Sequence, residues 1–354
     1  MRINLSLFMR TYYPFVNIAR FFAIFLVIVG HVTKNEFLFN SIFCFHMPLF
    51  FILSGFLFVP DGNLKQVAVK KFKSLIVPYL FFYALTLAYF WIVESRFRES
   101  LVDSEWMRLL PFVLGCNYGA SMSHNIVLWF LPALFCVELL ADVLYTRVKN
   151  EGIRVGIVLA IGAAGFVMSE VGIWELPWGI SQAMVMLPFF VLGIYFQSLL
   201  QALQLSKLKS WMLFVVSAAV FVCLLGVVGK NSVQSGLFPS IPLFLLSSVI
   251  GSLMVISLAM ICGRVPVFEA LGAGSVTLVV MCIHEPLYRP LVIMASRLTG
   301  IDARSDVMLT LVVSAVTFVL CYLASIVYNK YIASRLARSA DRLLGESGNY
   351  SADT

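Results

Sequence analysis

Long apolar runs separated by short charged segments repeat along the whole chain. An α-helix needs about 20 mainly apolar residues to cross the hydrocarbon core of a bilayer, and the runs are close to this length. They cover residues 13–32, 41–59, 75–94, 125–145, 153–168, 180–200, 211–228, 239–262, 271–287 and 307–330. The runs are apolar throughout, whereas the strands of a membrane barrel alternate between apolar and polar residues. The pattern predicts an all-α, polytopic transmembrane bundle of about ten helices.

The composition indicates that the chain lies mostly in lipid. Of its 354 residues, 61% are hydrophobic and 12% are charged, and the mean hydropathy is +0.95. In a soluble domain about 25% of the residues are charged. A chain with half of that fraction cannot cover a globular surface with polar groups, so we expect most of its surface to face lipid.

The distribution of Lys and Arg predicts the orientation. If the N-terminus is cytoplasmic and ten helices follow, 17 of the 25 basic residues lie in cytoplasmic segments. The outer segments then hold Lys34, Arg96, Arg98, Arg108, Lys230, Arg289, Arg297 and Arg304. This asymmetry fits the positive-inside rule and predicts that both termini are cytoplasmic. The net charge of +7 is then a topological signal that suits anionic lipid, and it does not indicate nucleic-acid binding.

We expect one transmembrane domain over residues 1–330 and a cytoplasmic tail over residues 331–354. Basic and apolar residues interleave in the tail, which predicts a basic amphipathic helix along the inner leaflet, followed by a disordered end. The longest outer loop, 95–123, is predicted to hold a short interfacial helix. The apolar face of that helix is Val102, Trp106, Leu109 and Leu110. The seven cysteines show no CxxC spacing, so the sequence indicates neither a disulfide framework nor a metal site.

Ionisable residues inside spans are candidates for function, because each costs about 2.5–3.5 kcal/mol or more at mid-bilayer. The four histidines of the chain are His31, His46, His124 and His284. With the predicted topology, all four fall in the outer half of the bilayer or at its rim. Histidine is also common at membrane interfaces, so an anchoring role stays open for each of them.

Arg20 and His31 stand at the two ends of the stretch RFFAIFLVIVGH. Eleven residues turn an α-helix by about 1100°, roughly 20° beyond three full turns, and advance about 16.5 Å along its axis. The two side chains therefore lie on one stripe of the first helix, with Arg20 near the cytoplasmic interface and His31 beyond mid-bilayer. Arg20 alone would also suit a snorkelling anchor. Together, a cation and a base on one stripe indicate two stations along a polar route through the bundle.

These two residues and four further elements resemble the signature of membrane acyltransferase family 3, of the bacterial glycan O-acetyltransferase type. After Arg20 and His31 come FFILSG (50–55), KKFKSLIVPY (70–79), WFLPALF (129–135) and LGAGSVTLVVMCIHEPL (271–287). The elements follow one another in the order of the family and cover most of the chain.

The resemblance implies an enzyme of the bacterial inner membrane that moves an acetyl group from cytoplasmic acyl-CoA to a hydroxyl of a cell-surface or lipid-linked carbohydrate, without a metal. It implies that His31 is catalytic, that Arg20 is required with it, and that Lys70 and Lys73 meet the CoA phosphates. The family often has arginine in this basic pair. Lysine binds phosphate as a point charge, so the contact is less geometrically specific here.

The chemistry can also be argued from the residues. A neutral imidazole that takes the proton of a hydroxyl speeds its attack on a thioester by typically 10²–10⁴-fold. Ser54 or Asn125 can donate to the developing oxyanion, and nothing in the sequence selects between them; we place Ser54 on the donor side. Glu138 is expected to be the one acid deep in a span, where it can orient a histidine or Arg20 or form a structural ion pair. The residues expected on the acceptor side are His46, His124, Asn125, Trp129 and His284.

Two other functions also fit a polar lane through ten helices. A transporter or glycolipid flippase would show inverted repeats with broken helices in matching halves, and the sequence shows none. A non-catalytic scaffold of a glycan-assembly complex would tolerate His31→Ala. The compact form and the HEPL ending favour exopolysaccharide or O-antigen acetylation. The sugar, its hydroxyl, the acyl chain and the oligomeric state stay open at this stage.

Overall fold

The computed structural model describes residues 12–99, 101–102, 104–203 and 206–344. Within these residues the protein is helical apart from its loops, with one isolated β-bridge between Ser232 and Leu237. Ten helical stretches in the described part are long and apolar enough to cross a membrane, which confirms the predicted all-α, polytopic bundle. They are Pro14–Val32, Glu36–Phe56, Leu64–Arg96, Ile126–Arg147, Glu151–Glu170, Pro177–Leu200, Lys207–Leu225, Ile241–Cys262, Gly274–Thr299 and Val307–Leu344. The direction in which they cross stays a prediction.

The α-helices follow one another with short connections. In chain order they are α1 (Pro14–Val32), α2 (Glu36–Phe43), α3 (His46–Phe56), α4 (Leu64–Lys71), α5 (Val77–Ile92), α6 (Pro111–Leu114), α7 (Phe130–Arg147), α8 (Glu151–Glu170), α9 (Ile180–Leu203), α10 (Lys207–Leu225), α11 (Ile241–Cys262), α12 (Pro266–Leu271), α13 (Gly274–Thr299), α14 (Val307–Val327) and α15 (Ala333–Leu344). A π-helical turn, Phe72–Ile76, joins α4 to α5, and another, Tyr328–Ile332, joins α14 to α15.

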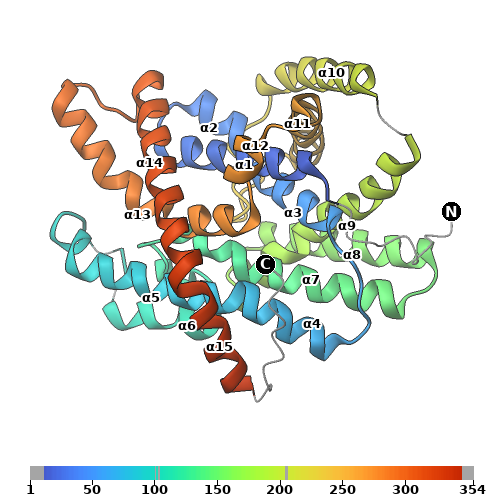
Figure 1. Cartoon of the computed structure of the whole chain (residues 1–354), viewed down its shortest axis with the longest axis horizontal. Helices are drawn as coiled ribbons and strands as arrows, with labels where there is room; N and C mark the ends of the chain where they lie inside the picture. Colours follow the sequence, from blue (N-terminus) through green and yellow to red (C-terminus); the bar gives the residue numbers. More distant parts are fainter. Residues whose placement is uncertain (1–11, 100, 103, 204–205, 345–354) are drawn as a thin grey trace.

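The first helix, α1, lies among helices from the N-terminal and C-terminal parts of the chain (Figure 1). It begins at Pro14, whose fixed φ and missing N–H suit the first turn of a helix. Around it pack α2, α3, α11, α12, α13 and α14. The stripe of α1 that carries Arg20 and His31 is therefore enclosed by other helices over most of its length.

The second span is broken between α2 and α3, at Cys44 and Phe45. The break interrupts the regular hydrogen bonds of the helix, and side chains donate to two backbone carbonyls there. Ser248 Oγ of α11 donates to the carbonyl of Cys44 at 2.8 Å. His46, the first residue of α3, donates from Nδ1 to the carbonyl of Ile42 at 2.9 Å. The break thus fixes the position of His46.

Several boundaries differ from the sequence-based prediction. The third span is longer than residues 75–94, because α4 and α5 continue each other through a π-helical turn. The ninth span was predicted to end at residue 287, yet α13 continues to Thr299. Within this longer helix, Glu285 and Arg289 form an ion pair, as described below, and so reduce the cost of placing both charges in a span. Glu285, at the centre of this helix, is buried, so the expectation that Glu138 is the one acid deep in a span is wrong.

The two predicted helices outside the spans have different outcomes. In the outer loop, the expected interfacial helix is a 3₁₀ turn, Glu105–Leu109, followed by the single turn of α6. Residues 333–344 of the tail form the basic helix α15, whose place on the inner leaflet stays a prediction. The predicted disordered end, 347–354, lies outside the described residues.

Candidate active site

The larger of two cavities beside α1 lies at its Arg20 end; we call it the basic cavity. Its volume is about 570 Å³. Helices α1, α3, α4, α7 and α13 and the loop after α3 line it. Its charged and hydroxyl-bearing lining residues are Arg20, Ser54, Asp61, Lys70, Lys71, Glu138 and Thr277. Of the residues predicted on the donor side, the structure therefore brings Arg20, Ser54 and Lys70 together, and Glu138 lies with them.

Two cations of the basic cavity are not neutralised by an acid within the described residues. Lys71 Nζ pairs with Glu138 Oε2 at 2.6 Å, so this acid holds the neighbouring lysine. Arg20, half-buried beside Gly274, has no ion-pair or hydrogen-bond partner among the described residues. Lys70 is exposed and likewise has no ion pair there. A guanidinium that faces a cavity and has no acidic partner suits an anionic ligand.

Lys73 lies away from this cavity. Its Nζ is 2.5 Å from Asp341 Oδ1 of α15, and it lines a separate groove beside α15. On a regular α-helix, residues three apart are neighbours. Here the chain passes from α4 into the π-helical turn at Phe72, between Lys70 and Lys73, and the two side chains face different surroundings. The structure thus does not bring the predicted basic pair together.

The second cavity lies at the other end of α1, and we call it the histidine cavity. Its volume is about 80 Å³. The residues that line it are Val27, His31, Phe43, His46, Met47, Ile126, Val127, Trp129, Ser232, Val233, Gln234 and Met281. The loop between α10 and α11 covers it, and Trp174 and Gln182 donate hydrogen bonds to the carbonyl of Gln234 at 2.9 and 3.1 Å. Of the residues predicted on the acceptor side, His46 and Trp129 lie here with the predicted base.

Three histidines from three helices lie close together here; His31 and His46 line the cavity, and the buried His284 lies beside His31 without lining it. The rings of His31 (α1) and His284 (α13) are 5.2 Å apart between centroids, and Phe43 lies between His31 and His46 (α3). His284 Nδ1 lies 2.9 Å from the carbonyl of Val280. Since a carbonyl only accepts, Nδ1 of His284, like that of His46, carries the hydrogen. His31 has no hydrogen-bond partner among the described residues, so its imidazole is free for a ligand in the cavity.

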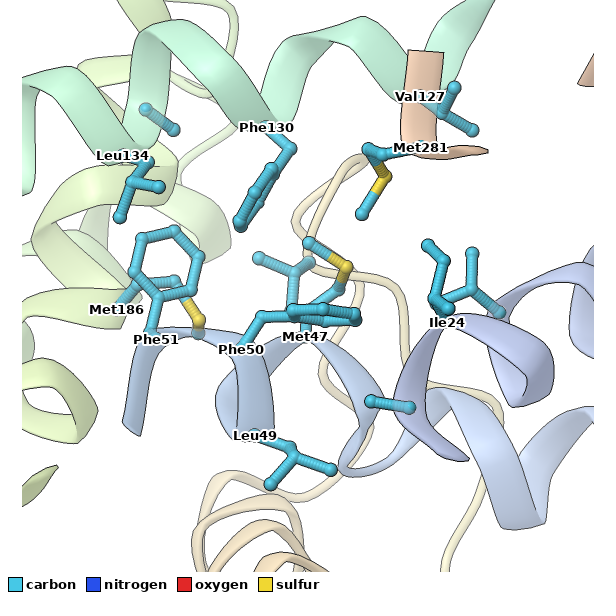
Figure 2. Close-up of a cluster of buried hydrophobic side chains, with 14 of the residues drawn as sticks. Ile24, Met47, Leu49, Phe50, Phe51, Val127, Phe130, Leu134, Met186 and Met281 are labelled. Carbon is cyan, nitrogen blue, oxygen red and sulfur yellow. The ribbon is translucent and has the colours of Figure 1, made fainter. Parts of the chain in front are cut away.

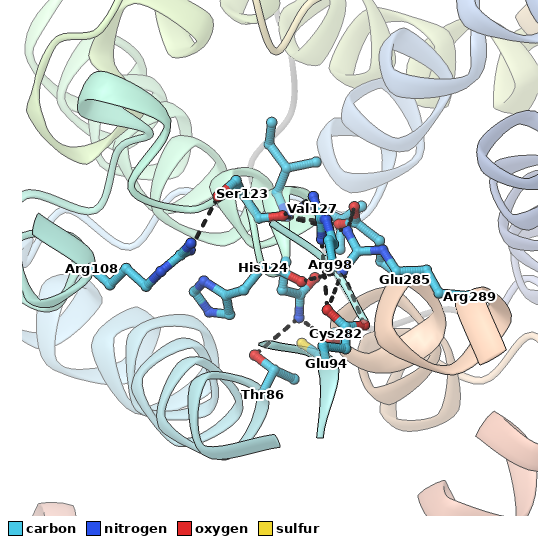
Figure 3. Close-up of polar contacts among 12 residues, drawn as sticks. Thr86, Glu94, Arg98, Arg108, Ser123, His124, Val127, Cys282, Glu285 and Arg289 are labelled. Atoms are coloured by element: carbon cyan, nitrogen blue, oxygen red, sulfur yellow. Dashed lines mark hydrogen bonds and ion pairs between the residues drawn. The ribbon is translucent and has the colours of Figure 1, made fainter. Parts of the chain in front are cut away.

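A charge network fixes α13 beside this site (Figure 3). Arg289 Nη1 pairs with Glu94 Oε2 at 3.0 Å and donates to the carbonyl of His124 at 2.7 Å, while Nη2 pairs with Glu285. Glu285 Oε2 in turn accepts from the backbone N–H of Ile126, at the start of the fourth span, at 2.7 Å. A carboxylate is favourable at a helix N-terminus, because the free N–H groups and the helix dipole attract it. The network therefore sets α13 against α7.

Asn125 lies in sequence between His124 and Ile126, whose backbone groups join the charge network, and it lines neither cavity. Pro286 has no N–H, so the carbonyl four residues earlier, that of Cys282, loses its helical partner. Asn125 Nδ2 donates to this carbonyl at 2.7 Å. The side chain thereby satisfies a backbone group that the proline leaves free, as polar residues do in membrane helices. This contact gives Asn125 a structural task.

His124 also lines neither cavity. Its side chain is buried against the ring of Tyr83, with 4.7 Å between centroids. Burial, together with the smaller effect of the charges of Arg108, Arg289 and Arg98, lowers the pKa of His124 to about 3. His124 lies outside the spans in the outer loop, where its backbone carbonyl, rather than its ring, serves the charge network.

The sequence interpretation missed three features of the site. Met281 lines both cavities, but in the sequence it is one apolar residue within an apolar run. The cover formed by Ser232–Gln234 lies in a loop without a motif. Glu285 and Arg289 did have a signal, because opposite charges four residues apart on a helix predict a pair.

The arrangement offers an anion-binding cavity and a free imidazole, about 16.5 Å apart along α1. Residues 13–326 match the family model described as an acyltransferase domain. No curated protein and no solved structure matches the chain.

Proposed function

The chain belongs to membrane acyltransferase family 3, and from this membership we propose that it transfers an acetyl group from acetyl-CoA to a hydroxyl of a cell-surface or lipid-linked carbohydrate. The proposal places the basic cavity on the cytoplasmic side of a bacterial inner membrane. The observation that carries it is the guanidinium of Arg20, which faces the basic cavity without a partner among the described residues, on the same helix as His31.

The basic cavity suits the phosphates of CoA. Arg20 can hold a phosphate through two parallel N–H···O bonds, and Lys70 adds a point charge nearer the mouth. Glu138 takes no phosphate itself. It holds Lys71 at 2.6 Å, so that this ammonium is fixed in the wall. Ser54 of α3 lines the same cavity, and we propose that its hydroxyl donates a hydrogen bond to the pantetheine part of CoA.

The two cavities suit the length of the donor. A pantetheine arm has about the backbone length of four residues and spans roughly 14 Å when extended. The step from Arg20 to His31 along α1 is about 16.5 Å. With its phosphates at Arg20, the donor thus brings its thioester close to His31, so one helix aligns both ends of the substrate.

The transfer then needs one base. His31 takes the proton of the acceptor hydroxyl while the hydroxyl oxygen forms a bond to the thioester carbonyl carbon. The tetrahedral intermediate collapses with cleavage of the C–S bond, and the thiolate of CoA takes the proton back from His31. The products are an acetyl ester and CoA thiol, and His31 returns to its starting form.

The acceptor hydroxyl would enter the histidine cavity. Trp129 offers an aromatic face there, and Ser232 and Gln234 bring polar side chains from the covering loop. An apolar surface with a few placed polar groups is the usual composition of a small-molecule site. His46 Nε2 remains free to accept a hydrogen bond from a sugar, because Nδ1 is held by Ile42.

Transfer of radiolabelled acetyl from acetyl-CoA to lipid-linked glycans, by purified protein in proteoliposomes, tests the proposal. We expect label in the glycan fraction together with an equal amount of free CoA thiol. His31→Gln removes the base and keeps the size of the side chain, so transfer should fall at least 100-fold. His124→Gln, a histidine that lines neither cavity, is the matched control and should retain activity.

Two outcomes contradict the proposal. Transfer that persists in His31→Gln would exclude His31 as the base. A folded wild-type protein that consumes no thioester with any glycan would exclude acyl-CoA as the donor.

A further inference from the structure

The two cavities meet at a single layer of side chains. Of the residues that line them, Met281 alone belongs to both. On α3, Met47 lines the histidine cavity and Phe50, one turn later, lines the basic cavity. On the fourth span, Trp129 lines the histidine cavity and the next residue, Phe130, lines the basic cavity. The partition is therefore about one side chain thick on each of these elements.

This layer is apolar and closed. Met47, Phe50, Phe130 and Met281 are all buried, and Figure 2 shows Phe130 and Met281 pointing from one side and Met47 and Phe50 from the other toward the same space. We call these four residues the apolar layer. On the route of the proposed function, the charged nucleotide stays in the basic cavity, because burying its phosphates in such a layer would be far too costly. The acyl end of the donor has to pass.

Met281, like Met47, can yield more easily than the two phenylalanines of the layer. A methionine side chain is unbranched and has three rotatable bonds, so it adapts to irregular spaces at small cost. The rings of Phe50 and Phe130 are fixed by edge-to-face packing, with 5.9 Å between their centroids. Met281 also lies one turn before His284 on α13, so the space that it vacates opens toward the histidines.

The space beyond the layer is small. The histidine cavity measures about 80 Å³, against about 570 Å³ for the basic cavity. A water needs about 10–15 Å³ by this measure, so the chamber holds only a few small groups beside the acceptor hydroxyl. The acyl chain that reaches His31 must fit between Met281, Met47 and Val27.

We propose that Met281 is the residue that determines acyl-chain specificity: its side chain closes the passage between the cavities and limits transfer to acyl groups of two or three carbons. This inference rests on the proposed function and extends it to the class of donor. Shortening Met281 removes the limit, and enlarging it closes the passage to every acyl group.

The test compares acetyl-, propionyl- and butyryl-CoA as donors for wild type and Met281→Ala in proteoliposomes. Each extra methylene changes discrimination by about 10-fold or more in an apolar pocket. We therefore expect the ratio of kcat/KM for butyryl-CoA to that for acetyl-CoA to rise at least 10-fold in Met281→Ala. Leu278→Ala is the matched control, because Leu278 lines the basic cavity but not the histidine cavity, one turn from Met281, and its ratio should stay at the wild-type value.

A second variant covers the case in which Met281→Ala does not fold. In Met281→Phe we expect unchanged affinity for CoA, measured by calorimetry, together with a fall of at least 10-fold in kcat for acetyl transfer. A wild-type ratio in folded Met281→Ala, an equal rise in Leu278→Ala, or normal kcat in Met281→Phe would each overturn the inference. Failure of the wild type to transfer any acyl group from CoA would instead count against the proposed function, so the two failures are distinguishable.

Discussion

Among the cationic side chains near the basic cavity, position on the helix decides which are free. Arg20 and Lys70 line the cavity and form no ion pair with an acid among the described residues. Lys71 and Lys73, in contrast, pair with Glu138 and Asp341. An ion pair already formed lowers the gain from a new anionic partner, because the old contact must first be lost. Only the free cations are therefore expected to contribute much to donor affinity.

Lys70→Ala should weaken binding of CoA about 5- to 10-fold, because one charge-assisted contact contributes about 1–1.5 kcal/mol. Lys73→Ala should leave the affinity for CoA unchanged, since Lys73 faces α15. Calorimetry with CoA and with dephospho-CoA measures both effects. Lys65→Ala, an exposed lysine on the same helix, is the control. Equal losses in Lys70→Ala and Lys73→Ala would contradict the separation of the two residues.

His124 makes a prediction about pH. Its pKa is about 3 in the folded protein and about 6.5 when solvated, so between these values the unfolded state binds a proton that the folded state does not. The free energy of unfolding that the neutral His124 contributes above pH 6.5 is therefore lost as the pH falls below this value. The loss is up to about 1.4 kcal/mol per pH unit. His124→Phe should remove this slope. Thermal unfolding in detergent from pH 7.5 to pH 5 compares the two proteins, and parallel curves would refute the assignment.

At the scale of helices, α13 shows how a polar sequence can cross the bundle. Two prolines and the charged pair Glu285–Arg289 lie inside it, yet it continues over 26 residues. The charged pair and the carbonyl freed by Pro286 have partners from other elements: Glu94 from the third span, and Asn125 and Ile126 from the start of the fourth. The same contacts place His284 and Met281 beside α1. The charged and proline residues that make α13 unusual in composition therefore also position the site residues through their contacts.

The pair of helices α3 and α9 depends on two glycines. A Cβ on Gly55 would stand 1.8 Å from the carbonyl oxygen of Phe190, and one on Gly193 would stand 2.0 Å from that of Ile52. Backbone atoms cannot move aside as a flexible side chain can, so small residues are required where membrane helices approach so closely. Gly55 of the FFILSG element thus lies where α3 and α9 approach each other most closely.

Gly55→Ala should therefore destabilise the protein by about 3 kcal/mol or more, above the usual range for overpacking, because α3 and α9 must separate. Gly156→Ala is the control on α8, where an added Cβ meets nothing within 4 Å. It should be neutral or slightly stabilising, since alanine favours helix more than glycine does. Melting temperatures in detergent decide between the two. A Gly55→Ala protein as stable as Gly156→Ala would show that α3 and α9 can be reorganised at little cost.

For the whole molecule, the sequence predicts what depends on periodicity and composition. Hydropathy gave the ten spans, and the helical repeat placed Arg20 and His31 on one stripe of α1. It could not separate Lys70 from Lys73, because the π-helical turn between them has no sequence signal in one chain. Asn125 and Cys282 are 157 residues apart, and no local pattern predicts such a contact. The position of Met281 between the two cavities can be recognised only in the structure, where it lines both of them.

The apolar layer also has an electrical consequence for the proposed reaction. Polar recesses lie on both sides of Met47, Phe50, Phe130 and Met281, so much of the transmembrane voltage would fall across this layer. The acyl group crosses it in one direction, and the proton of the acceptor hydroxyl leaves with the thiol in the other. Neither movement carries net charge across the voltage. The membrane potential would then neither drive nor oppose acylation, and the energy of the thioester alone would set its direction.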